Sequence, residues 1–99
     1  MKLPKYRKPT HPGEILLEEF LKPLGISQAR FVRHLGRTWT YAKLNEIIRG
    51  KRGVTPDTAI DLAMAFETTP MFWLNLQLCY DLWEASQYKR EIEPIQIAL

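Results

Sequence analysis

The start signals of helices recur at short intervals along this chain, and they restrict it to a set of short helices. Thr55, Pro56 and Asp57 combine an N-cap residue, a proline at the first helical position and an acid in the first turn. Thr69 and Pro70 repeat the first two of these features. Because a proline disfavours the helical conformation in the residue before it, each signal marks the start of a separate helix.

Capping residues and glycines divide the chain into five predicted helices. The first begins at Pro12, and the others cover residues 28–35, 41–49, 56–67 and 70–86. Ser27 and Thr40 are the additional N-cap residues, and Pro23 and Gly25 are expected to end the first helix. Apolar residues recur on one face of each helix. The predicted core consists of Ile15, Leu16, Leu17, Phe20, Leu21, Ala29, Phe31, Val32, Leu35, Leu44, Ile47, Ile48, Ala59, Leu62, Ala63 and Phe66.

A length of 99 residues allows one small core, so we expect a single all-α domain over residues 11–86. Residues 1–10 carry four bases and two prolines and form either a solvated terminus or a basic arm that follows a phosphate backbone. Residues 87–99 form a short C-terminal tail. Pro94 interrupts it, and alternating Ile95, Ile97 and Leu99 permit a short strand or an extended strap.

Charge is unevenly distributed along the chain. The formal net charge is only +3, yet half of the 14 basic residues lie within residues 27–52. The sequence after residue 52 is acidic. Such a distribution predicts a polyanion partner on one face and a different kind of partner on the other. The basic residues of this stretch are Arg30, Arg33, Arg37, Lys43, Arg49, Lys51 and Arg52.

The second and third predicted helices, joined by a short turn after Gly36, form a candidate helix-turn-helix unit. The third helix would enter a major groove while the second crosses the DNA backbone. The side chains opposite its apolar face are the predicted base-reading residues Thr40, Tyr41, Ala42, Lys43 and Asn45. The predicted phosphate-binding residues are Ser27, Gln28, Arg37, Arg49, Lys51 and Arg52. Trp39 would either read a base or plug the core.

The fifth predicted helix is apolar over much of its circumference. One small core does not easily cover two stripes of large side chains, so we favour a homodimer interface over the alternative of a central core helix. The predicted interface residues are Trp73, Leu74, Leu78, Leu82 and Trp83. Asp81 is predicted to be a buried hydrogen-bonding residue, and Cys79 a small core residue.

Enzyme and metal chemistry find little support in the sequence. His11 and His34 have no partners at ligand spacing, so we expect no metal and no cofactor. His11 is instead expected to cap the first helix. No catalytic triad, glycine-rich phosphate loop or pair of buried carboxylates can be assembled. The N-terminus has no apolar signal segment, and no apolar run is long enough to span a bilayer, so we expect a cytoplasmic protein.

Three segments resemble the HigA-type antitoxins, a branch of the XRE-family helix-turn-helix proteins that includes the virulence-associated protein I (VapI) group. They are HPGEILLEEFLKPLGIS at 11–27, NEIIRGKRGVTPDTAIDLA at 45–63 and TTPMFWLNLQLCYDLWEAS at 68–86. The resemblance covers about residues 11–86. It implies a five-helix, lambda-repressor-like domain that acts as a homodimer. The turn after Gly36 is longer than in the usual family pattern, and Arg37 stands where a small apolar residue is usual.

The resemblance also implies a function. Proteins of this family bind a palindromic operator in their own promoter as transcriptional repressors. They commonly neutralise an mRNA-cleaving toxin of the HigB/RelE type that is encoded beside them. The alternative is a stand-alone or phage-type regulator without a toxin partner.

Overall fold

Each helix in the described part of the chain begins at a residue whose side chain caps it. The computed structural model describes residues 8–36 and 38–97. The hydroxyl oxygens of Ser27, Thr40, Thr55 and Thr69 each accept a hydrogen bond from the N–H three residues further on. The imidazole Nδ1 of His11 accepts one from the N–H of Gly13, at 2.9 Å. The predicted caps are therefore the observed ones.

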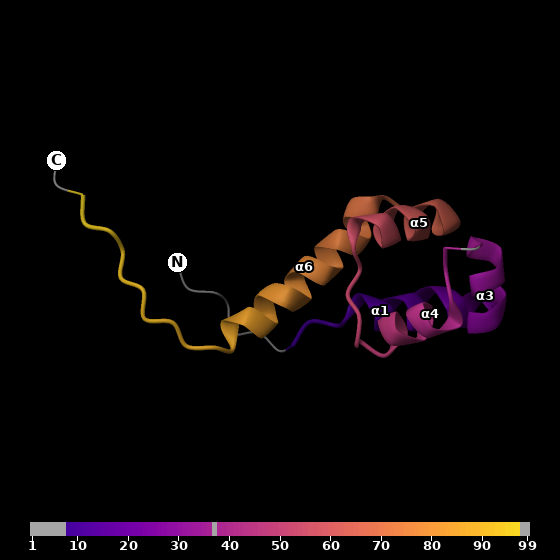
Figure 1. Cartoon of the computed structure of the whole chain (residues 1–99), viewed down its shortest axis with the longest axis horizontal. Helices are drawn as coiled ribbons and strands as arrows, with labels where there is room; N and C mark the ends of the chain where they lie inside the picture. Colours follow the sequence, from indigo (N-terminus) through magenta and orange to yellow (C-terminus); the bar gives the residue numbers. More distant parts are fainter. Residues whose placement is uncertain (1–7, 37, 98–99) are drawn as a thin grey trace.

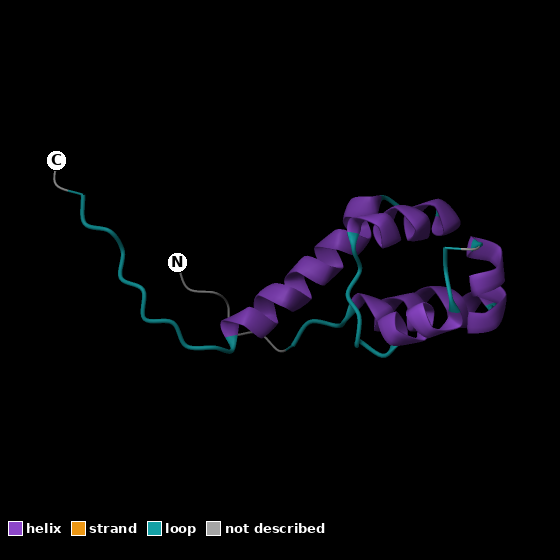
Figure 2. Cartoon of the chain, in the orientation of Figure 1, coloured by secondary structure: helices purple, strands orange, loops and turns teal. Residues whose placement is uncertain are grey.

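The five predicted helices are all present, and no strand occurs within residues 8–36 and 38–97 (Figure 2). The first is continuous and contains α1 (Pro12–Ile15), the π-helical segment η1 (Leu16–Leu21) and α2 (Lys22–Leu24). The others are α3 (Gln28–Leu35), α4 (Tyr41–Ile48), α5 (Pro56–Phe66) and α6 (Pro70–Ser86). The all-α fold is thus confirmed.

Pro23 does not end the first helix, contrary to the prediction. The wider turn of η1 precedes it, with the N–H of Lys22 donating to the carbonyl of Leu17. A proline ring clashes with the carbonyl four residues earlier in a regular α-helix, and a π-helical turn before it changes that spacing. The helix ends at Gly25, whose φ of 66° is left-handed and whose neighbour Ile26 donates to the carbonyl of Leu21.

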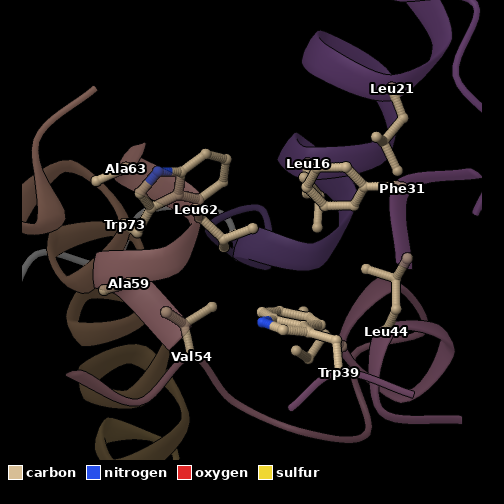
Figure 3. Close-up of a cluster of buried hydrophobic side chains, with 11 residues drawn as sticks. Leu16, Leu21, Phe31, Trp39, Leu44, Val54, Ala59, Leu62, Ala63 and Trp73 are labelled. Atoms are coloured by element: carbon tan, nitrogen blue, oxygen red, sulfur yellow. The ribbon is translucent and has the colours of Figure 1, made fainter. Parts of the chain in front are cut away.

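The core lies between the first helix, α3, α4, α5 and the N-terminal half of α6 (Figure 3). Phe66 packs against Phe20 and Phe31, with ring centroids 4.7 and 5.1 Å apart. Most of the predicted core residues are buried or half-buried in this cluster. Ala29 is exposed, which corrects the prediction for α3, because Phe31 and the half-buried Val32 and Leu35 are the residues of that helix that face the core.

Helix α6 divides into a core half and a projecting half, and this corrects one predicted interface residue. Trp73 has an exposed fraction of 0%, and its indole N–H donates to the hydroxyl of Thr68 at 2.8 Å. A side chain without exposed surface cannot contact a second subunit, so Trp73 belongs to the core. Leu74 is half-buried against the same core. The central-core alternative therefore describes the N-terminal half of α6.

The C-terminal half of α6 extends beyond the other helices (Figure 1). Leu78 and Leu82 are 55% and 48% exposed there, and Trp83 is half-buried. Cys79 and Asp81 are exposed, so their predicted burial is wrong. They lie on the projecting half, where no second layer of helices covers them.

The tail after α6 runs away from the helices as an extended chain without a strand in its described part, residues 87–97 (Figure 1). Every residue from 87 to 97 is exposed. The radius of gyration is 17.1 Å and the longest axis 60 Å, whereas a compact domain of 100 residues has a radius of gyration of about 13 Å. The larger radius of gyration reflects the projecting helix and the tail.

The first helix and α4 approach each other closely at Gly13. A Cβ atom at this position would overlap the backbone carbonyl of Ile47. Gly13 is buried, and the carbonyl belongs to the inner face of α4. The absence of a side chain at residue 13 therefore sets the distance between the two helices.

We expect the substitution Gly13→Ala to lower the free energy of unfolding by about 3 kcal/mol, because a backbone clash can be relieved only by separating two packed helices. Chemical denaturation of the two proteins measures the difference. Glu14→Ala, at the exposed neighbouring position, is the matched control and should change stability little. Equal midpoints for Gly13→Ala and the wild-type protein would contradict the close packing.

Candidate nucleic-acid interface

The turn between α3 and α4 is anchored in the core by Trp39. Its side chain is 4% exposed, and its indole N–H donates to Asp61 Oδ2 on α5 at 2.8 Å. The backbone N–H of Trp39 donates to the carbonyl of Gly36, whose φ is 101°. Trp39 was expected either to read a base or to fill the core, and the structure shows that it fills the core. The turn therefore contains a buried aromatic anchor.

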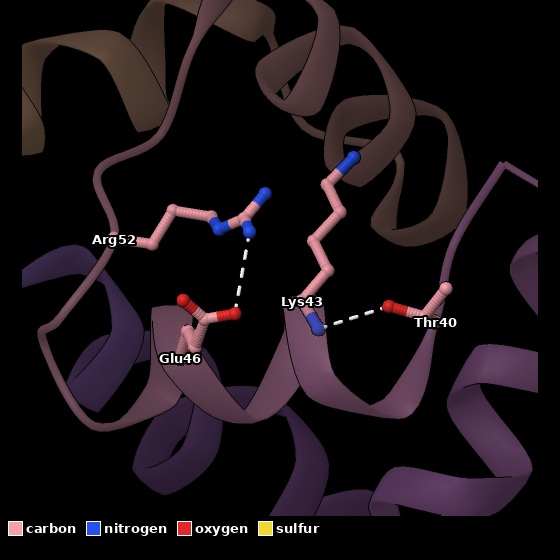
Figure 4. Close-up of polar contacts among 4 residues, drawn as sticks. All are labelled: Thr40, Lys43, Glu46 and Arg52. Carbon is pink, nitrogen blue, oxygen red and sulfur yellow. Dashed lines mark hydrogen bonds and ion pairs between the residues drawn. The ribbon is translucent and has the colours of Figure 1, made fainter.

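Thr40, directly after this anchor, starts α4 with its N-terminal turn exposed. Its hydroxyl accepts from the N–H of Lys43 at 3.0 Å (Figure 4). Thr40, Tyr41 and Ala42 are all exposed, Tyr41 to 54%. Leu44 and Ile47 face the core. These three predicted base-reading residues thus lie together on an accessible surface.

Lys43 and Asn45 have partners within the protein. The ammonium group of Lys43 lies 4.2 Å from the centroid of the Trp39 ring, a cation–π contact. Asn45 is half-buried, and its Nδ2 donates to Gln28 Oε1 on α3 at 3.2 Å. This bond links the two helices of the unit. Sequence reasoning did not foresee it, because periodicity places residues on faces without pairing them across helices.

Three of the predicted phosphate-binding cations, Arg49, Lys51 and Arg52, are exposed in the loop after α4. Gly50, with φ of 73°, turns the chain there. Arg52 forms an ion pair of 3.2 Å with Glu46 (Figure 4). The backbone carbonyl of Glu46 also accepts from the N–H groups of Lys51 and Arg52. We call residues 49–53 the basic loop.

Two further predicted phosphate ligands lie at the N-terminus of α3. Ser27 is exposed and caps the helix, and Gln28 is half-buried against Asn45. Such a helix end presents N–H groups and the positive end of the helix dipole to an anion. Arg37 lies outside the described residues.

The described end of the predicted N-terminal arm contacts α6. The ammonium of Lys8 lies 5.2 Å from the ring centroid of Tyr80 and 5.5 Å from that of Trp83. The other bases of the arm, Lys2, Lys5 and Arg7, lie outside the described residues. Lys8 thus approaches the projecting half of α6.

His11 lies where the start of the first helix, the basic loop and α6 meet. It is 9% exposed, and its ring makes an edge contact with Tyr80 at 4.9 Å between centroids. Burial lowers the pKa of the imidazole below the ordinary 6.5, against the opposing attraction of Asp81 and Glu84. The neutral ring is also the form whose Nδ1 accepts the bond from Gly13.

No cluster of three or more metal-ligating side chains occurs within residues 8–36 and 38–97. In the same part of the chain, none of the helices combines the length and apolar character needed to cross a bilayer.

Two packed helices with a turn anchored by a buried tryptophan, an exposed start of the second helix and a flanking basic loop define a helix-turn-helix DNA-binding protein. The chain belongs to the HigA-type antitoxin branch of this class, which includes virulence-associated protein I. Its sequence is 45% identical over 85 residues to virulence-associated protein I of Dichelobacter nodosus, covering 86% of this chain and 77% of that protein. It is 37% identical over 98 residues to antitoxin HigA-1 of Vibrio cholerae, covering 94% and 90%.

Solved structures agree with this assignment. The Pseudomonas aeruginosa antitoxin HigA, solved with the higBA promoter, is 41% identical, with a TM-score of 0.80 over 90% of this chain and 100% of that one. The antitoxin GraA in complex with its operator is 39% identical, with a TM-score of 0.76 over 93% and 100%. No protein-family model matches the chain.

Stability should depend on pH through His11. Below pH 6.5 the unfolded chain takes up a proton that the buried imidazole resists, because the pKa of His11 is lower in the folded state. The contribution of the neutral His11 imidazole to the free energy of unfolding is fully present above pH 6.5 and is lost as the pH falls toward the folded-state pKa. His11→Asn keeps a capping oxygen and does not titrate. Its unfolding free energy should therefore fall less than that of the wild-type protein between pH 7.5 and 5.5. Parallel denaturation profiles would contradict this.

Proposed function

We propose that this protein is a sequence-specific transcriptional repressor and the antitoxin of a toxin–antitoxin pair. In this function it binds a palindromic operator in its own promoter as a homodimer, in the cytoplasm, and neutralises an mRNA-cleaving toxin of the HigB/RelE type. The observation that carries the proposal is the exposed N-terminal turn of α4, fixed by Trp39 and flanked by the basic loop. Relatives of the same fold have been solved with promoter and operator DNA.

In this function α4 enters the major groove and α3 crosses the DNA backbone. Thr40, Tyr41 and Ala42 reach base edges directly from their exposed positions. Lys43 reaches a guanine by leaving the ring of Trp39. Asn45 contributes chiefly by holding Gln28, whose amide NH₂ group then serves as a phosphate donor.

The phosphate contacts come from both sides of α4. Ser27 and Gln28 supply donors at the start of α3, and Arg49, Lys51 and Arg52 supply charge from the basic loop. Arg37, in the turn, adds a further charge to this proposed set. A dimer would place two such units about 34 Å apart, one helical turn of DNA.

The projecting half of α6 is the proposed dimer interface. Leu78 and Leu82 present apolar surface there, with Leu74 and Trp83 half-buried at its edges. Acidic residues of the same half could instead complement a basic, RNA-binding toxin. Neither partner need compete with DNA for the base-reading surface, because that surface lies on α4.

The alternative function is a regulator without a toxin partner. The gene next to the coding sequence discriminates between the two, since a small basic open reading frame of the RelE type would support the antitoxin. Co-expression of the two products, followed by a growth assay, is the direct test. Rescue of growth by this chain supports the antitoxin function, and persistent toxicity supports the regulator.

DNA binding itself is tested by a gel shift with the protein's own promoter at several salt concentrations. Lys51→Ala should weaken binding to specific and random DNA alike and flatten the slope of log K against log salt by about 1 unit, because one phosphate contact is lost. Lys89→Ala removes the same charge from the exposed tail and serves as the control. A wild-type protein that shows no specific shift would refute the proposed repressor.

Lys43 should affect sequence preference rather than general affinity. Lys43→Ala is expected to relax the preference at one base position, at a cost of about 1–3 kcal/mol for the preferred operator. Lys43→Met keeps an aliphatic stem over Trp39 and should show the same relaxation, which separates base reading from packing. Selection from a randomised operator library measures the preference at each position. An unchanged preference in both variants would remove Lys43 from the base-reading set.

A further inference from the structure

The basic loop is held by hydrogen bonds to two different helices. Within the loop, Lys51 and Arg52 donate to the Glu46 carbonyl on α4, at 2.8 and 3.2 Å. At its end, the backbone N–H of Val54 donates to Gln77 Oε1 on α6, also at 2.8 Å. The second bond joins residues 23 positions apart in the sequence. The loop is therefore fixed between α4 and α6.

Gln77 is itself oriented by a second bond on α6. Its Nε2 donates to Asp81 Oδ1, one helical turn further on, at 2.9 Å. The two bonds use the oxygen and the nitrogen of the same amide, so the group has one preferred orientation toward Val54. Gln77 is half-buried, while Asp81 is exposed.

Gly53 provides the space that this arrangement needs. A Cβ atom at residue 53 would lie 3.1 Å from the amide carbon of Gln77 and 3.2 Å from its oxygen and nitrogen. Such distances are tighter than an ordinary contact, so a methyl group at residue 53 would shift the amide by a few tenths of an ångström. The glycine is needed here for space beside Gln77.

We propose that Gln77 is a positioning residue for DNA binding: from α6 it fixes the basic loop in the conformation that presents Lys51 and Arg52 to phosphate. This rests on the proposed repressor function. Glycines at residues 50 and 53 give the free loop many conformations, and ordering it on binding would reduce affinity. Because of the bond to Val54, the conformational entropy of the loop is lost when the protein folds and not when it binds DNA. A residue distant from the base-reading surface thus sets phosphate affinity.

The test uses the full-length protein and the promoter DNA. Gln77→Ala should weaken operator binding roughly three- to tenfold, in line with the loss of one hydrogen bond. It should also flatten the salt dependence by about 1–2 units, because Lys51 and Arg52 no longer contact phosphate together. The preferred base at each operator position should stay the same. Asn75→Ala, at an exposed position of the same helix, is the matched control and should bind as the wild-type protein does.

Gly53→Ala and Gln77→Ala, made singly and together, form a double-mutant cycle. On its own, Gly53→Ala should weaken binding, but by less than Gln77→Ala does, because the added methyl group shifts the amide and strains its bond to Val54. In the Gln77→Ala background the amide is absent, and the same substitution should have little further effect. Additive losses in the double variant would overturn the proposal, since they would show that the two residues act independently.

Hydrogen exchange of the free protein provides a readout that does not depend on DNA. The amide of Val54 should exchange faster in Gln77→Ala, and those of Lys51 and Arg52 should also lose some protection, because the loop that carries their bonds to Glu46 is released at its other end. A wild-type salt slope in a Gln77→Ala protein that melts at the wild-type temperature would overturn the proposal and leave the repressor function intact. A wild-type protein that fails to bind its promoter would overturn both.

Discussion

The position of α4 depends on the burial of one indole ring. Trp39 fills the space between the turn and α5, and its N–H is satisfied by Asp61. A large aromatic side chain with its polar atom paired contributes burial energy and a defined orientation together. The outer face of the same ring supports Lys43. One residue therefore connects the core, the turn and the surface proposed for DNA.

The helices could be predicted from sequence because their ends are encoded locally. A threonine or serine cap acts within three residues of itself, so Thr40, Thr55 and Thr69 identify helix starts without knowledge of the fold. The core faces of α4 and α5 follow equally from the spacing of their apolar residues. At the end of the first helix, the stop at Gly25 was predicted correctly, but the one at Pro23 was not, because the π-helical turn before it has no local sequence signal.

The assignment of individual residues on α6 required the structure. Its two apolar stripes are equivalent in the sequence, and only the neighbouring helices show that Trp73 is in the core while Leu78 and Leu82 are exposed. Pairs between distant segments, such as Gln28 with Asn45, leave no periodic signal either. The site was therefore predictable as a unit, the helix-turn-helix and its basic loop, and not as a set of contacts.

The extended tail has a consequence for how large this protein appears in solution. Its projecting helix and exposed C-terminal residues give the single chain a long axis of 60 Å, although its mass is only 11.6 kDa. Molecules of this shape diffuse more slowly than spheres of equal mass and leave a sizing column early. A monomer would thus elute at the volume of a heavier globular protein. The subunit number follows from light scattering or sedimentation equilibrium, which measure mass and are insensitive to shape.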